Sequence, residues 1–184
     1  MKVDVHILVY PTSPTKWLDQ CLESLNNEPI NIHIIDVKDS RYESIGNYRI
    51  EGFSKGEEDY VSYVDADDYI LPKAFSKALP MLAKHLPNYA CTWERVYKED
   101  TKKFLRTNKF NHHLKFYKRS FIKNFFDTYK NNGAEGDPIV QTLLKDTAFD
   151  LGYVGYVWRV HDYGWHNAIN RNNLVKKNRN TKNA

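Results

Sequence analysis

The sequence contains few cysteines and no long hydrophobic run. Cys21 and Cys91 are the only cysteines among 184 residues, and their separation does not match the short spacing of a zinc site. We therefore expect two reduced thiols in the core, which excludes a disulfide-stabilised scaffold. No stretch approaches the ~20 consecutive apolar residues of a membrane-spanning helix, and the start is too short in apolar length for a signal peptide. These absences predict a cytoplasmic protein without a membrane span.

Acidic residues are absent from the last 14 positions, 171–184, which carry five basic residues. Before position 171 the chain holds 22 basic and 23 acidic residues, so the positive net charge of +4 comes from this tail. Hydrophobic residues make up 41% and aromatic residues 14%, which is enough for one folded unit. We expect a single domain over residues 1–170, followed by a basic tail that is solvated or that contacts phosphates.

Strand and helix patterns alternate along the first half of the chain. Strands are expected over 3–10, 30–37 and 60–64. Helical spacing begins at Pro14, around Ser44–Phe53 and after Pro72. Further strands are expected over 89–97, 114–118 and 153–161. Strands separated by helices predict an α/β fold with a mostly parallel, Rossmann-like central sheet flanked by helices.

Polar residues follow the first three predicted strands. Pro11 and Thr12 come after the first strand, Asp36 ends the second, and the DADD segment, 65–68, ends the third. Ligands of open parallel sheets lie outside the carboxyl ends of the strands, so one rim would collect these groups. Three neighbouring carboxylates repel each other unless a cation neutralises them, and oxygen donors favour Mn²⁺ or Mg²⁺. A solvent-facing turn or helix cap is the alternative for the same residues.

Several segments together resemble the glycosyltransferase family 2 type of GT-A enzymes. The likeness covers ILVYPTSPTKWLDQCLESL, NYRIEGFSKGEEDYVSYVDADD, AEGDPIVQTLL and VWRVH, roughly residues 3–166. Arg49 precedes Asp65 by 16 positions, which is the family's spacing between its arginine and the first aspartate of the DxD motif. The resemblance implies one GT-A domain, with a donor-binding half over about 1–88 and an acceptor and catalytic half over about 89–170.

The resemblance also implies roles for individual residues around a nucleoside-diphosphate sugar, with UDP as the expected nucleotide. The donor-binding residues it implies are Pro11, Thr12, Asp36, Arg49, Asp65 and Ala66. Asp67 would bind a Mn²⁺ or Mg²⁺ ion at the diphosphate, with Asp65 and His161 as further ligands. His166 competes with His161 for the last position.

Catalysis requires a base for the acceptor hydroxyl, and Asp137 matches the family's acidic position at the start of a helix. Glu135 is its rival, because family members usually have Glu-Asp without a break where this chain has Glu135-Gly136-Asp137. Attack on the face opposite the diphosphate would invert the anomeric configuration. Asp137 could instead simply cap the helix that Pro138 begins.

Two other functions fit parts of the sequence. A nucleotidyltransferase of similar fold is disfavoured because the YPTSPT segment, 10–15, lacks the glycine and basic residues that hold a triphosphate. A non-catalytic nucleic-acid-binding protein would use the basic tail. For a transferase, a modified nucleobase in viral DNA suits the small, Lys-, Asn- and Tyr-rich chain, which would then work in the host cytoplasm; a saccharide is the other acceptor.

Overall fold

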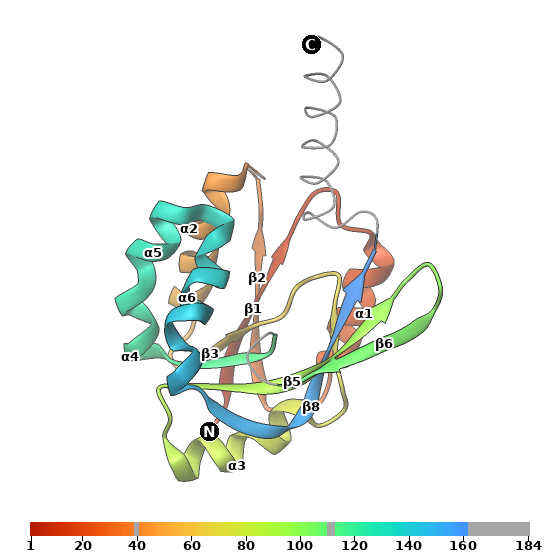
Figure 1. Cartoon of the computed structure of the whole chain (residues 1–184). Helices are drawn as coiled ribbons and strands as arrows, with labels where there is room; N and C mark the ends of the chain where they lie inside the picture. The colour runs from red at the N-terminus through yellow and green to blue at the C-terminus, as the bar shows by residue number, and fades with distance from the viewer. Residues whose placement is uncertain (39–40, 110–112, 162–184) are drawn as a thin grey trace, which may run out of the picture.

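A computed structural model describes residues 1–38, 41–109 and 113–161 (Figure 1). Its centre is an eight-stranded sheet in the order β2-β1-β3-β7-β5-β8-β4, with β6 paired to β5. The strands are β1 (Val3–Val9), β2 (Ile30–Asp36), β3 (Tyr60–Tyr63), β4 (Tyr69–Ile70), β5 (Tyr89–Lys98), β6 (Lys103–Asn108), β7 (Lys115–Lys118) and β8 (Phe149–Val160). The predicted tail, 171–184, and His166 lie outside the described residues.

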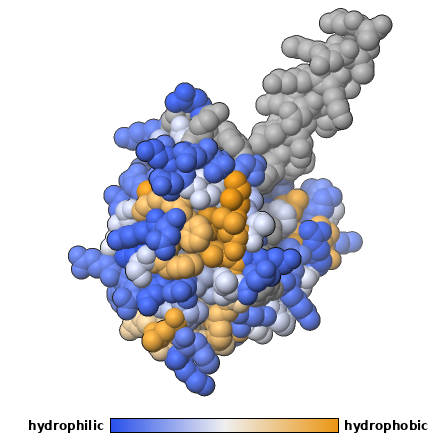
Figure 2. All heavy atoms as spheres, turned by 60° about the vertical axis from the view of Figure 1, so that its left-hand side comes forward, coloured by the Kyte–Doolittle hydropathy of each residue, from blue (hydrophilic) through white to orange (hydrophobic). Residues whose placement is uncertain are grey.

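Helices cover both faces of this sheet. They are α1 (Thr15–Leu25), α2 (Tyr42–Ser54), α3 (Ala74–His85), α4 (Arg119–Ile122), α5 (Phe126–Asn132) and α6 (Gly136–Leu144), with 3₁₀ turns at Lys123–Phe125, Gly133–Glu135 and Lys145–Thr147. None of the helices in the described part of the chain is long and apolar enough to cross a membrane. Figure 2 shows the side that carries α5 and α6, where an area of hydrophobic residues is surrounded by hydrophilic ones.

The two faces of the sheet pack into separate cores. Val3, Val5 and Ile7 pack with α1 and α3 in the larger cluster of buried residues. On the other face, Val61 and Tyr63 of β3 pack with α2, α4, α5 and α6. Because both faces of β1 and β3 are covered, these strands are buried along nearly their whole length.

The prediction of an α/β domain is confirmed, but the sheet is mixed rather than mostly parallel. The pairs β1–β2, β1–β3 and β5–β8 are parallel, whereas β3–β7, β5–β7, β5–β6 and β4–β8 are antiparallel. The second half of the chain causes the difference: β7 enters between β3 and β5, and β5 turns back on itself through β6. Local periodicity shows that a strand exists but not which way its neighbour runs.

Two helices and one strand also differ from expectation. The helix expected to begin at Pro14 begins at Thr15, with Pro14 in extended conformation at the cap. Pro80, which could have ended α3, lies inside that helix. Strand β6 was not predicted, because five of its six residues are exposed and its pattern does not alternate.

Gly46 allows α2 and α5 to approach closely. A Cβ atom at this position would lie 1.9 Å from the backbone oxygen of Tyr129, far inside van der Waals contact. Since backbone atoms form the obstacle, a side-chain rotation cannot relieve the clash. The contact fixes α2, which carries Arg49, against the segment that leads to Asp137.

Replacing Gly46 with alanine should therefore separate the two helices. We expect Gly46→Ala to lower the free energy of unfolding by about 1–3 kcal/mol, as overpacked cores do. Asn47→Ala, at an exposed neighbouring position of α2, serves as the control and should change it by less than about 0.5 kcal/mol. Urea denaturation of both variants measures the difference, and equal stabilities would show that the helices are not packed this closely.

Candidate active site

The site lies where β1, β2 and β3 end at one edge of the sheet. These strands are parallel, so their carboxyl ends lie together. Pro11 and Thr12 follow β1 and are exposed, and Asp36 is the exposed last residue of β2, opposite Val9. The structure thus brings these three predicted donor-binding residues to one accessible rim, next to the loop that follows β3.

Arg49 joins the two most separated parts of the site. This residue of α2 is only 6% exposed. Its Nη2 donates to Asp65 Oδ1 at 2.9 Å, and its Nε donates to Asp137 Oδ2 at 3.1 Å. The guanidinium carbon lies 3.7 Å from the centre of the Tyr63 ring, which covers one face of the cation. The predicted donor residue and the predicted base therefore share one buried cation.

Charge pairing decides the protonation states in this cluster. Burial opposes ionisation of Asp65, but the Arg49 guanidinium and His113 outweigh it and hold the pKa of Asp65 below its usual range. Burial likewise opposes the charge on Arg49, yet Asp137 and Asp65 raise the pKa of Arg49 well above normal. Burial, offset only in part by Arg49, raises the pKa of the nearby Tyr10 hydroxyl to about 12. The site thus combines a fixed cation with fixed carboxylates.

Asp137 occupies the first turn of α6, and two donors hold it. Besides the contact with Arg49, its Oδ1 accepts a hydrogen bond of 2.9 Å from the Tyr129 hydroxyl. The Asp137 side chain keeps 20% of its surface exposed, so one side of the carboxylate faces solvent. Glu135 lies in the preceding 3₁₀ turn and is exposed, and it has no hydrogen bond or ion pair within residues 1–38, 41–109 and 113–161.

Asp67 and His161 form the second part of the site. His161 Nε2 lies 2.8 Å from Asp67 Oδ2, across 94 positions of sequence. The histidine ring packs against Trp17 of α1, with ring centres 4.2 Å apart. The Asp67 side chain is 36% exposed, so its carboxylate is accessible while the ring of His161 is nearly buried. Two predicted metal ligands are therefore neighbours.

Asp68 has a structural task that its neighbours do not share. It is 2% exposed, and its carboxylate accepts hydrogen bonds from the Tyr156 hydroxyl at 2.8 Å and from the Arg159 backbone N–H at 2.7 Å. Burial, followed by the charges of Asp67 and Asp65, raises the pKa of Asp68 well above its usual range. Ala66 is also buried, at 4% exposure, within the larger core cluster. The loop is thus anchored by Asp68 and Ala66 and presents Asp65 and Asp67.

His113, which no feature of the sequence indicated, also lies beside Asp65. Its Nε2 lies 3.8 Å from Asp65 Oδ2, its Nδ1 contacts the buried Glu94 carboxylate, and its ring stacks on Tyr156 with centres 4.9 Å apart. Ligand atoms of Asp65, Asp68 and His113 lie within 4.8 Å of one another. No local pattern marks His113, because its partners come from β5, β8 and the loop after β3.

Two sets of side chains could hold a metal ion: Asp65, Asp68 and His113, and the pair Asp67 and His161. They differ in which ligand atoms are available. Both Asp68 oxygens already accept hydrogen bonds, and Asp65 Oδ1 is bonded to Arg49. Asp67 and His161 have ligand atoms 2.8 Å apart at an accessible position, close enough to share one ion. A carboxylate with an imidazole fits Mn²⁺, and carboxylates alone fit Mg²⁺ as well. The residues present therefore fit the predicted ion at Asp67.

This arrangement of a helix-covered α/β sheet with an acidic loop after its third strand defines the GT-A class of fold. The family model described as "Glycosyl transferase family 2" matches residues 41–140, more than half of the chain. The chain belongs to glycosyl transferase family 2. No functionally curated protein matches the sequence.

Solved structures show the same fold. The chain is similar to S. aureus TarS 1-349 in complex with UDP, with a TM-score of 0.67 and 15% identity over 88% of this chain and 61% of that one. It is also similar to TarS 1-349 in complex with UDP-GlcNAc, with a TM-score of 0.63 and 14% identity over 91% of this chain and 61% of that one. The chain thus spans about three fifths of the length of TarS 1-349.

Removing the shared cation should destabilise the site. Arg49→Met leaves Asp65 and Asp137 without their buried partner, and we expect the free energy of unfolding at pH 7 to fall by about 3–5 kcal/mol. Lys55→Met, at the C-terminal cap of the same helix and with only an exposed pair to Glu51, should change it by less than about 1 kcal/mol.

The pH dependence of this loss has a definite sign. The pKa of Asp65 is lower in the folded than in the unfolded state, so its stabilising contribution is present above its ordinary pKa and is lost as pH falls through the lowered value. Urea titrations between about pH 6 and pH 2 should therefore show the gap between wild type and Arg49→Met narrowing as the pH falls to the ordinary aspartate value of 3.8 and below. A gap that stays constant over this range would contradict the role of Arg49.

Proposed function

We propose that this chain is a metal-assisted glycosyltransferase. It would transfer the sugar of a UDP-sugar to an acceptor hydroxyl and invert the configuration at the anomeric carbon. Its membership of glycosyl transferase family 2 supports the reaction class. The observation that carries the residue assignment is Arg49, which joins Asp65 of the donor half to Asp137 of the acceptor half at one rim. The complexes of TarS with UDP and UDP-GlcNAc support UDP as the nucleotide.

The donor would lie across the ends of β1, β2 and β3. Pro11 and Thr12 offer an exposed surface for the nucleobase, and the exposed Asp36 carboxylate can accept its imide hydrogen. Asp65 is held by Arg49 in a fixed orientation, so its remaining oxygen can accept a ribose hydroxyl. Because these groups are already positioned, little ordering is needed when the nucleotide binds.

Asp67 and His161 would hold Mn²⁺ or Mg²⁺ next to the diphosphate. The ion supplies positive charge to the diphosphate oxygens as the leaving group departs. Trp17 packs on His161 and limits the movement of this ligand. Asp68 keeps the loop in place through Tyr156 and Arg159 and does not itself need to bind the ion.

Asp137 is the proposed general base. The acceptor oxygen would form a bond to the anomeric carbon on the face opposite the diphosphate, and the bond to the diphosphate would break with its electron pair leaving on the nucleotide. The hydroxyl proton would pass to Asp137, whose exposed side faces the solvent. Arg49 and Tyr129 hold this carboxylate in one orientation, so it can receive a proton without rearranging.

The acceptor is a modified nucleobase in DNA or a saccharide hydroxyl. Both present a hydroxyl group to the same base, so the catalytic residues do not distinguish them. Recognition of the acceptor therefore depends on surfaces outside the cluster of Arg49, Asp65 and Asp137.

Donor binding can be tested without knowing the acceptor. UDP-GlcNAc with Mn²⁺ at about 100 times its dissociation constant should raise the melting temperature by about 5–10 °C. Asp67→Ala should lose most of this shift, whereas Asp146→Ala, at an exposed position in the last 3₁₀ turn, should keep it. The absence of any shift in wild type with UDP-sugars and either metal would refute the proposed function.

The base assignment can be tested by slow donor hydrolysis, in which water replaces the acceptor. Asp137→Asn should lower the rate of UDP release by about 10²–10⁴-fold while the affinity for UDP-GlcNAc stays unchanged, because only proton transfer is removed. Glu135→Gln should retain the wild-type rate. If Glu135→Gln loses activity and Asp137→Asn does not, Glu135 is the base.

A further inference from the structure

The β5–β6 hairpin concentrates positive charge at one side of the domain. Residues 93–109 hold six basic and three acidic side chains, although the chain before position 171 has one more acid than base. The acids are accounted for: Glu94 is buried beside His113, Glu99 pairs with Arg159 and Lys102, and Asp100 pairs with Lys98. The cations that remain exposed are Arg95, Lys103, Arg106 and Lys109.

Two of these cations, Arg95 and Lys109, contact aromatic side chains, whereas the register of the hairpin places Lys103 and Arg106 on its other face. Phe104 is 52% exposed, the Arg95 guanidinium lies 5.5 Å from its ring centre, and the Tyr97 ring lies 5.3 Å away. Farther along the hairpin, Lys109 Nζ lies 5.0 Å from the centre of the Trp93 ring. Aromatic rings beside exposed cations offer stacking faces next to positive charge, which suits a ligand that carries both flat rings and negative charge.

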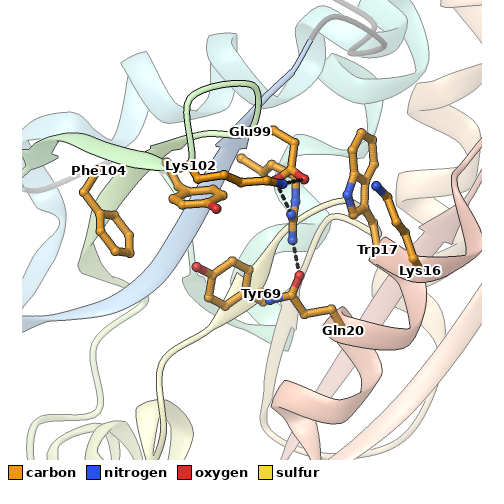
Figure 3. A pocket seen from close by; sticks show the side chains of 9 residues that line it. Lys16, Trp17, Gln20, Tyr69, Glu99, Lys102 and Phe104 are labelled. Carbon is orange, nitrogen blue, oxygen red and sulfur yellow. Dashed lines mark hydrogen bonds and ion pairs between the residues drawn. The ribbon is translucent and has the colours of Figure 1, made fainter.

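A pocket of about 410 Å³ continues this surface toward the active site (Figure 3). Its lining comes from α1, β4, the β5–β6 hairpin and β8: Lys16, Trp17, Gln20, Tyr69, Tyr97, Glu99, Lys102, Phe104 and Arg159. Arg159 bonds to both Glu99 and Gln20. In Figure 3, Tyr69 and Phe104 lie on one side of the pocket, and Trp17 and Lys16 lie on the other.

Arg159 connects this pocket to the loop that carries Asp67. Its Nε donates to the Asp67 backbone oxygen at 2.6 Å, and its backbone N–H donates to Asp68. Its guanidinium lies 5.3 Å from the Trp17 ring centre and 5.5 Å from that of Tyr69. A molecule bound in the pocket would therefore contact Arg159, which itself bonds to the backbone of the proposed metal ligand Asp67.

The composition of the surface distinguishes between ligand classes. Neutral sugars are bound by amides and carboxylates that receive their hydroxyl hydrogens, and here Gln20 and Glu99 already bind Arg159. Exposed cations beside aromatic rings instead match a strand in which phosphates alternate with unstacked bases. We propose that the β5–β6 hairpin and its adjoining pocket bind single-stranded nucleic acid. Resting on the proposed function, this assigns the surface to a nucleic-acid acceptor.

Fluorescence anisotropy with a fluorescein-labelled oligothymidylate of about 20 nucleotides tests this proposal on the full chain, since one compact domain covers roughly 4–16 nucleotides. Phe104→Ala should weaken binding about tenfold or more through lost stacking. Leu105→Ala is the matched control, because Leu105 has the same 52% exposure in the same strand but does not line the pocket. Arg95→Gln should reduce the slope of log affinity against log salt by about 0.7.

The outcomes separate this proposal from the proposed function. Oligonucleotide binding that Phe104→Ala and Arg95→Gln leave within twofold of wild type would place the strand elsewhere, for example on residues 171–184, and overturn the proposal. The proposal would also be overturned if the wild-type protein did not bind the oligonucleotide at all. It would be overturned as well if the hairpin bound hyaluronan oligosaccharides and Phe104→Ala weakened that binding rather than oligonucleotide binding. The affinity for UDP-GlcNAc, measured by calorimetry on the same variants, should equal that of wild type. If wild type does not bind UDP-GlcNAc, the proposed transferase function is refuted, but the proposal that the hairpin binds nucleic acid is not.

Discussion

The buried cation of Arg49 is the interaction on which the site depends. Placing a guanidinium at 6% exposure costs several kcal/mol unless partners replace its lost water. Asp65, Asp137 and the face of Tyr63 supply that replacement, and each comes from a different segment of the chain. The cation is thus stable only when α2, the loop after β3 and the start of α6 are all in place, so the folded state is also the state in which the site is assembled.

The three acids in the loop after β3 have different environments and therefore different roles. Asp65 is paired with a cation, Asp67 faces solvent beside His161, and Asp68 is buried among hydrogen-bond donors. Burial opposes the charge of both Asp65 and Asp68, but only at Asp65 do neighbouring cationic groups outweigh it, which is why the pKa of Asp68 rises while that of Asp65 falls. Repulsion among the three is therefore relieved by fixed protein groups at two positions, which leaves Asp67 as the carboxylate available to an ion.

Much of the first half of the chain could be predicted from the sequence, because its information is local. The apolar alternation of residues 3–9 and the acids at the ends of the second and third strands locate the rim, and parallel neighbours bring those ends together. In the second half, the strands expected over 89–97, 114–118 and 153–161 are present as β5, β7 and β8, but their order in the sheet is set by partners distant in sequence. Strand β6 was missed because it is exposed on both faces. His113 escaped notice because Glu94, Tyr156 and Asp65 meet it only through sheet pairing.

Arg159 makes the two halves depend on each other. Its side chain ties the Asp67 backbone to Glu99 in the hairpin and Gln20 in α1, while its backbone anchors Asp68. Two of the groups bonded to the Asp67–Asp68 segment, the Nε and the backbone N–H of Arg159, belong to this one residue, which also bonds to Glu99 at the end of β5, so a shift of the hairpin would affect the loop. Under the proposed function, a single strand of nucleic acid bound at the pocket would contact the Arg159 guanidinium, which also supports the proposed metal-binding loop. Acceptor recognition and donor positioning would then be linked through one buried side chain, without any movement of the sheet.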